Sequence, residues 1–205
     1  MQKKKLRIES TSLPGNYGSV DYTFSIWIYI NSWNYQYGEE KIVLFRGKEA
    51  NNTATSEQSP KVTLDSNTNN LKIETLTYST SDKTSPGVNN TCSVSNIPIQ
   101  KWVHILFTTN NNTMDTYLDG KLVKTCVLKG VPKMDKSAPL FLTPNGGFSG
   151  YTSRLRYFAR TINPREAYEI YKEGYSDSLF GGILNKYKLK LSFLKGSEEV
   201  SSISL

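Results

Sequence analysis

The strongest structural signal in this chain is a hairpin between residues 113 and 127. Asp119-Gly120 lies between two strand-like segments and is typical of a type I′ turn, because both central residues of that turn take positive φ angles. A two-residue loop also determines which residues face one another across the strands. The predicted pairs are Leu118–Lys121, Tyr117–Leu122, Thr116–Val123 and Asp115–Lys124, the last of them an opposite-charge contact.

Apolar patterns elsewhere predict further strands. Val20–Ile30 carries apolar residues on both faces, which indicates a central strand that is covered on both sides. The other strand-like segments are Lys41–Arg46, Lys61–Asp65, Leu71–Tyr78, Trp102–Thr109, Tyr187–Leu194 and Glu199–Leu205. The composition agrees with strands, since thirteen tyrosines stand against one histidine and aromatic side chains suit pleated surfaces.

One helix is expected, and it begins at Asn163-Pro164-Arg165-Glu166. Asn163 suits the N-cap and Pro164 the first helical position, while Glu166 occupies the third and would reach back to the cap. Gly174 follows the last turn. The apolar face of this helix consists of Ala167, Ile170 and Tyr171. The helix is therefore expected to pack on a sheet or on its rim.

Together these elements predict an all-β fold, an antiparallel two-sheet β-sandwich with one short helix near the C-terminal part. Residues 1–205 are assigned to a single domain, because all-β domains often reach roughly 200–250 residues. The strands within residues 181–205 are expected to pair with Leu6–Ser12 and close a sheet. The residues predicted to contribute to the space between the sheets are Phe24, Ile26, Ile28, Leu106 and Leu118.

Four segments carry a family resemblance: Phe24–Ile30, Lys41–Gly47, residues 102–123, and Pro144–Phe158, which leads into the predicted helix. In this order and spacing they resemble the laminin-G-like branch of the concanavalin-A-like jelly rolls. The resemblance covers about residues 20–174. It implies a jelly-roll sandwich, with residues 181–205 supplying closing strands.

Three shorter stretches narrow this resemblance. N-I-P-I-Q-K-W at 96–102, Y-L-D-G-K-L-V-K-T-C at 117–126 and T-P-N-G-G-F-S-G-Y at 143–151 are similar to versions of the domain carried by large eukaryotic DNA viruses. The resemblance implies a virion- or capsid-associated protein whose partners are other proteins of the particle. The expected location is the virion, or otherwise an extracellular or surface-exposed site.

The charge pattern restricts the partners. The formal net charge is +7, but the basic residues are scattered and only Lys3-Lys4-Lys5 form a run. A nucleic-acid reader needs basic residues gathered on one element or interleaved with exposed aromatics, so nucleic-acid binding is not predicted. No stretch approaches the ~20 apolar residues that span a bilayer, so no membrane span is predicted either. Binding to acidic or sulfated glycans stays open.

The sequence predicts that the protein is not an enzyme. Retaining glycosidases need two carboxylates on one face about 5 Å apart, whereas Glu39 and Glu40 are adjacent and would point to opposite faces of a strand. His104, the only histidine, is interpreted as a wall residue of its strand. No metal site or cofactor is predicted. The resemblance allows calcium, but Asp119 is explained by its turn and no Asp-rich loop offers oxygen ligands.

Two functions are compatible with these features. The first is a non-catalytic structural or interaction module, and the alternative is a carbohydrate-binding, lectin-like domain. For the alternative, the candidate ligand-binding residues are Trp33, Tyr35 and Tyr37, because alternate aromatics on one strand face can stack on sugar rings. A loop packed over the sheet explains the same W-N-Y-Q-Y run equally well.

Cys92 and Cys126, the only cysteines, each lie in a strand-like segment. They form either two buried thiols or a disulfide. The family resemblance places their segments close in space and thereby predicts the disulfide. Asn-x-Ser/Thr sequons occur at Asn51, Asn89 and Asn111, all in segments expected to be loops. These asparagines would carry glycans only if the protein takes a secretory route.

Overall fold

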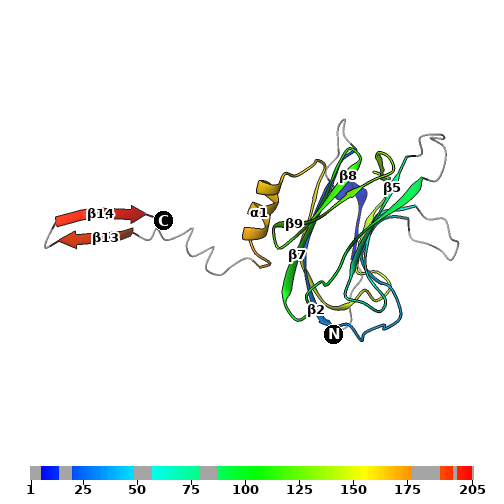
Figure 1. The fold of residues 1–205 in the computed structure, drawn as a ribbon, viewed down its shortest axis with the longest axis horizontal. Coiled ribbons are helices and arrows are strands. Elements are labelled where there is room, and N and C mark those ends of the chain that lie inside the picture. The colour runs from blue at the N-terminus through cyan, green and yellow to red at the C-terminus, as the bar shows by residue number, and fades with distance from the viewer. Residues whose placement is uncertain are drawn as a thin grey trace. The chain divides into compact units, whose positions relative to one another are not determined.

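The computed structural model describes residues 6–13, 20–48, 57–78, 87–176, 190–195 and 198–204. The chain divides into two compact units, Met1–Glu173 and Gly174–Leu205, whereas one domain over residues 1–205 is expected from the sequence. In the first unit, two antiparallel sheets face one another, and α1 (Pro164–Lys172) lies outside the smaller sheet (Figure 1). The predicted all-β sandwich with one short helix is confirmed for the described residues.

The larger sheet contains seven strands, and hydrogen-bonded neighbours run in the order β1-β11-β3-β4-β5. Both β6 and β10 pair with β5. The strands of this sheet are β1 (Leu6–Ile8), β3 (Lys41–Gly47), β4 (Gln58–Leu64), β5 (Leu71–Thr77), β6 (Val88–Val94), β10 (Pro132–Lys133) and β11 (Leu140–Leu142). A short 3-10 helix, η1 (Ser10–Ser12), follows β1.

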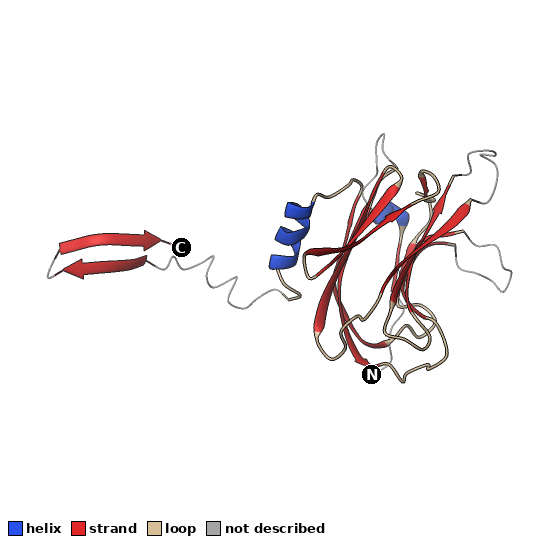
Figure 2. Cartoon of the chain, viewed as in Figure 1, coloured by secondary structure: helices blue, strands red, loops and turns tan. Residues whose placement is uncertain are grey.

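The smaller sheet contains five strands in the order β12-β2-β7-β8-β9. Figure 2 shows the strands of the sandwich in two layers. They are β12 (Ser149–Phe158), β2 (Thr23–Ser32), β7 (Trp102–Asn110), β8 (Thr113–Leu118) and β9 (Lys121–Val127). The central position of β2 explains its pattern, because one face meets the other sheet and part of the opposite face is covered by α1. No helix among the described residues is long and apolar enough to cross a membrane.

The main core fills the space between the sheets. Phe24, Ile26 and Ile28 of β2 are fully buried there, and Leu118 packs against the same cluster, as predicted. The prediction for Leu106 was wrong, because Leu106 belongs to a second buried cluster on the opposite face of the smaller sheet. Its companions there are Tyr117, Ile162, Ala167 and Ile170. Side chains alternate along a strand, and neighbouring Ile105 faces the main core.

The β8–β9 hairpin turns at Asp119 and Gly120, whose φ angles are 48° and 74°. Leu118–Lys121 and Tyr117–Leu122 pair as predicted. A bulge then inserts Val123, so the two predicted pairs beyond it were wrong. The observed pairs are Thr116–Lys124, Asp115–Thr125, Met114–Cys126 and Thr113–Val127. A bulge adds one residue to one strand and thereby shifts every later pair.

Helix α1 begins as the sequence predicts. The side chain of Asn163 accepts a hydrogen bond of 2.9 Å from the backbone N–H of Glu166, and Pro164 is the first helical residue. The carboxylate of Glu166 binds the guanidinium of Arg160 and does not reach back to the cap as expected. Gly174, with a φ of 76°, follows the helix.

The first strand pairs inside the first unit. β1 lies antiparallel to β11, with Arg7 opposite Phe141. In the second unit, β13 (Lys190–Lys195) pairs with β14 (Glu198–Ser204) as a two-stranded sheet. Within the two units β1 pairs with β11 and the last strands pair with one another, so the expected pairs with Leu6–Ser12 are not among the described strand pairs of either unit. Residues 187–189 of the predicted Tyr187–Leu194 strand lie outside the described residues.

Candidate ligand-binding surface

The predicted aromatic site at residues 33–37 lies in a loop between β2 and β3. Gln36 there has a φ of 49°, and a residue in the left-handed region interrupts strand alternation. The three aromatic rings therefore do not share a strand face. The structure thus places this run in a loop and not on a strand face.

Trp33 attaches the start of this loop to the main core. Its indole packs against the main core, and the ammonium of Lys41 lies 5.3 Å from the centroid of its ring. Lys41 is only 1% exposed, and its ammonium donates to the carbonyl oxygens of Glu39 (3.2 Å) and Ser66 (3.3 Å). Burial lowers the pKa of this ammonium. Trp33 is thus held between the core and a buried cation, where a sugar has little access to its ring.

The two tyrosines of the loop differ in exposure. The hydroxyl of Tyr35 donates to the carbonyl oxygen of Gly146 (3.3 Å), and the amide of Gln36 donates to that of Asn145 (3.4 Å). The loop is therefore attached to the turn that precedes β12. Tyr37 is 65% exposed, compared with 36% for Tyr35. Tyr37 offers the largest open ring surface of the three predicted residues.

A second aromatic surface, not predicted from the sequence, crosses the outer face of the smaller sheet. Tyr29 of β2 lies directly opposite Trp102 of β7 and Tyr151 of β12. The ring centroid of Tyr29 is 5.7 Å from that of Trp102 and 6.2 Å from that of Tyr151. Tyr151 is 55% exposed, and the other two are partly exposed. We call Tyr29, Trp102 and Tyr151 the aromatic row.

Helix α1 covers part of the outer face of the smaller sheet and leaves the rest exposed. Two residues before Tyr29, Trp27 lies on the same face but is only 6% exposed, because Tyr171 of α1 stacks on it with 5.6 Å between ring centroids. The aromatic row lies beyond that covered region, and exposed Asn31 follows it at the point where the pairing of β2 with β12 shifts register. The sequence shows Tyr29 on this face, but only the strand register brings Tyr151 and Trp102 beside it.

His104 lies beneath the helix. Its side chain is fully buried, its Nε2 shares a hydrogen bond of 2.8 Å with the hydroxyl of Ser25, and its ring centroid is 5.0 Å from that of Trp27. Burial lowers its pKa to about 4, with a smaller lowering from Arg156 and opposing contributions from Asp119 and Glu173. A Ser–His contact that is sealed in this way has no access to a substrate. His104 is a wall residue between the sheet and α1.

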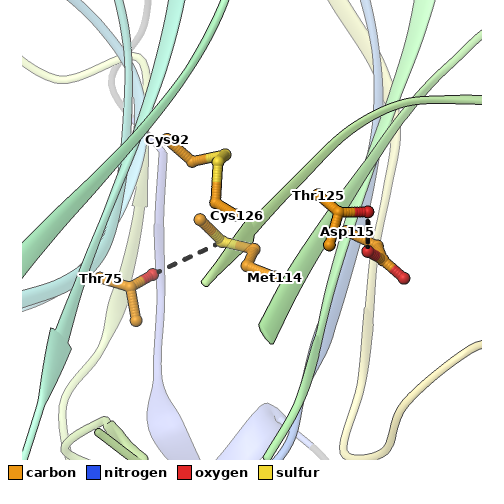
Figure 3. Close-up of a disulfide and its surroundings, with 6 residues drawn as sticks. All are labelled: Thr75, Cys92, Met114, Asp115, Thr125 and Cys126. Atoms are coloured by element: carbon orange, nitrogen blue, oxygen red, sulfur yellow. Dashed lines mark hydrogen bonds between the residues drawn. A yellow bond between two sulfur atoms is a disulfide. The ribbon is translucent and has the colours of Figure 1, made fainter. Parts of the chain in front are cut away.

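A disulfide joins Cys92 of β6 to Cys126 of β9, with their Cα atoms 5.9 Å apart (Figure 3). This distance lies within the usual range for a disulfide. Because β6 belongs to the larger sheet and β9 to the smaller one, the bond links the two sheets at one side of the sandwich. Met114 lies beside it, and its sulfur accepts a hydrogen bond of 3.8 Å from Thr75.

This architecture has a counterpart among known families. A laminin G family model, described as "Concanavalin A-like lectin/glucanases superfamily", matches residues 3–167. The chain belongs to this superfamily. The match covers both sheets of the sandwich and the start of α1. No curated protein matches the sequence significantly.

Solved structures with a fold similar to this concanavalin A-like domain include receptor-binding regions of botulinum neurotoxins. The serotype D ligand-binding domain in complex with N-acetylneuraminic acid has a TM-score of 0.60 at 13% identity, covering 82% of this chain and 39% of that chain. The serotype G binding domain gives 0.57 at 12% identity, with 82% and 42% covered. The chain thus spans about two fifths of these structures, and the likeness shows the fold.

The sequons of this concanavalin A-like domain lie in different settings. Asn111 is exposed in the turn between β7 and β8, whereas Asn89 is exposed within strand β6 and not in the expected loop. Asn51 lies outside the described residues. In the described part of the chain, no three His, Cys, Asp or Glu side chains gather in a way that could hold a metal ion.

Proposed function

We propose that this domain is a non-catalytic, lectin-like module that binds glycans through the aromatic row. The observation that carries this proposal is the alignment of Tyr29, Trp102 and Tyr151 across three neighbouring strands of a rigid sheet. The superfamily includes both lectins and glucanases, so membership alone does not decide between binding and hydrolysis.

The geometry of the aromatic row suits a sugar. The apolar faces of sugar rings pack on aromatic side chains, whose faces are large, stiff and electron-rich. Neighbouring strands lie about 4.8 Å apart, so three rings across β12, β2 and β7 offer a track about 10 Å long. Exposed Asn31, two residues beyond Tyr29, supplies an amide that can hydrogen-bond sugar hydroxyls. We infer that the bound glycan crosses the strands and contacts more than one ring.

The candidate glycans follow from charge and from the structural comparison. The protein is basic, with a net charge of +7, which favours anionic glycans by long-range attraction. The similar serotype D domain was solved with N-acetylneuraminic acid, an anionic sugar. Sialylated and sulfated glycans are therefore the first ligands to test, together with neutral ones.

The test is a glycan array probed with the full chain and with Tyr151→Ala and Tyr29→Ala. Each substitution should weaken binding about tenfold, because truncation of a central aromatic residue commonly costs more than 1 kcal/mol. Tyr78→Ala is the matched control, since Tyr78 is 40% exposed and follows β5 of the other sheet. Unchanged binding by both row variants, or no glycan binding by the wild-type chain, would refute the proposal.

Tyr37→Ala distinguishes the two aromatic surfaces. Because Tyr37 lies in the loop and not in the aromatic row, this variant should bind glycans as the wild type does. A loss of binding in Tyr37→Ala with normal binding in Tyr151→Ala would move the site to the loop at residues 33–37.

A structural module in the particle of a large DNA virus is the second proposal. Its support is the amino-acid sequence of residues 96–102, 117–126 and 143–151, which resembles versions of the domain in such viruses. Under this proposal the protein is located in the virion and contacts other particle proteins. Mass spectrometry and cross-linking of purified particles should find it in fixed proportion to the capsid proteins, and its absence would reject the proposal.

A further inference from the structure

Strand β9 is an edge of the smaller sheet and exposes three large apolar side chains. It pairs with β8 on one side and ends the strand order of its sheet. Leu122, Val123 and Val127 are 50%, 44% and 75% exposed. An open edge presents backbone N–H and C=O groups that can pair with another strand. Burial of large apolar side chains on such an edge by a partner stabilises the resulting complex.

Two cations lie on this edge, and the bulge at Val123 changes the partner of one of them. Without the bulge, Lys124 would lie opposite Asp115, but it lies opposite Thr116. Asp115 instead accepts a hydrogen bond of 2.6 Å from Thr125 (Figure 3). Lys124 and Lys121 are both exposed, and neither forms an ion pair with any described residue. Two positive charges are thus available to a partner.

The bulge also sorts the side chains of β9 onto two faces. Lys121 lies opposite Leu118, which faces the main core, and Lys124 lies opposite Thr116 on that same face. Leu122 lies opposite Tyr117, which faces α1, and Val127 lies opposite Thr113 on that face. One face of the edge therefore carries the two lysines, and the other carries Leu122 and Val127 with Thr125 between them.

We propose that β9 is a docking edge for an extended segment of another protein in which acidic and apolar residues alternate. Such a segment extends the smaller sheet by one strand, with its acidic side chains beside Lys121 and Lys124 and its apolar ones beside Leu122 and Val127. Backbone hydrogen bonds supply affinity, and the two faces of β9 select the alternation. This site is independent of the aromatic row.

Charge decides between this partner and a second copy of the chain. If two β9 strands paired antiparallel about Lys124, the two Lys124 side chains would lie directly opposite one another, and like charges in that position are destabilising. Edge lysines and bulges are also common devices against self-pairing. The same lysines attract an acidic strand, so they prevent self-association and favour a partner of opposite charge.

The probe is a fluorescent peptide of four Glu-Val repeats, titrated into the full chain with intact disulfide and followed by anisotropy. A peptide of four Lys-Val repeats is its charge-reversed counterpart. The Glu-Val peptide should bind saturably and the Lys-Val peptide at least about tenfold more weakly. The double variant with Lys121→Glu and Lys124→Glu should prefer the Lys-Val peptide, since each cross-strand charge pair changes affinity by up to about fivefold.

Lys48→Glu is the control, because Lys48 is exposed beyond β3 of the other sheet. This substitution changes the net charge by the same amount as a single Lys124→Glu. Amide hydrogen exchange should show new protection in β9 when the Glu-Val peptide is bound. The proposal is overturned if Lys48→Glu weakens binding as much as Lys124→Glu, if protection falls on other strands, or if the wild-type chain dimerises through β9.

Discussion

Cys92 and Cys126 lie on strands of opposite sheets with 5.9 Å between their Cα atoms, and their disulfide is the covalent link between the two layers of the sandwich. Cys126 lies opposite Met114, which is buried in the main core. The bond therefore attaches the outermost strand of the hairpin directly to the side of the core. β9, with no neighbour on its outer side among the described strands, is held by its pairing with β8 and by this bond.

Replacement of both cysteines by serine should lower the free energy of unfolding by about 3–4 kcal/mol. The disulfide closes a loop of 34 residues, and a loop of this size restricts the unfolded chain by that amount in the chain-entropy model. Urea unfolding of the wild type and the double variant measures the difference. Reductant should lower the stability of the wild type to that of the variant and leave the variant unchanged. Equal stabilities without reductant would contradict this prediction.

Stability should fall in mild acid because of His104. Its pKa is about 4 in the folded protein, below the ordinary value of 6.5, because burial disfavours the charged ring. Between these pH values the unfolded chain binds a proton that the folded protein does not, so stability declines as the pH falls from about 6.5 to about 4. The slope is at most about 1.4 kcal/mol per pH unit and the total about 3 kcal/mol.

His104→Gln isolates this contribution. Several carboxyl groups also have lowered pKa values, including Asp65 at about 2, and they lose their stabilising charge in more acidic solution. The difference between the wild type and His104→Gln should therefore change mainly between pH 6.5 and 4. Urea unfolding at several pH values gives this difference. A constant difference across that range would show that His104 does not titrate as proposed.

Asn163→Ala should destabilise the attachment of α1. The side chain of Asn163 accepts the hydrogen bond from the backbone N–H of Glu166, and loss of an N-cap costs about 1 kcal/mol. Asn163→Asp keeps a capping oxygen and should retain most of the stability. Thermal unfolding of the three proteins measures the effect. Equal losses in the alanine and aspartate variants would mean that the cap is not the cause.

Leu106→Ala should cost about 2–5 kcal/mol and loosen the helix in particular. Leu106 is fully buried in the cluster that joins the smaller sheet to α1, so its truncation leaves a cavity there. Hydrogen exchange should increase most in α1. Leu44→Ala, which truncates a fully buried leucine of the main core, serves as the control and should not act on α1 preferentially. Identical exchange patterns in the two variants would contradict this placement of Leu106.

Local features were predictable from the sequence alone. The Asp119-Gly120 turn and the first two hairpin pairs follow from the φ angles that these residues tolerate. The start of α1 follows from Asn163 and Pro164, whose roles depend on neighbouring backbone atoms. The apolar pattern of β2 likewise indicated a strand buried on both faces. In each case the interaction involves residues close in the chain, or a periodicity that one strand carries by itself.

Features that depend on several strands were decided only by the tertiary structure. The bulge at Val123 changed the partner of Lys124, and α1 buries Leu106 on the face of the smaller sheet that lies opposite to the main core. The aromatic row exists because two registers place Trp102 and Tyr151 on either side of Tyr29. A strand alternates its side chains with a period of two, but nothing local says which neighbour or helix will cover each face. Packing of distant segments makes that choice, and both proposed binding surfaces depend on it.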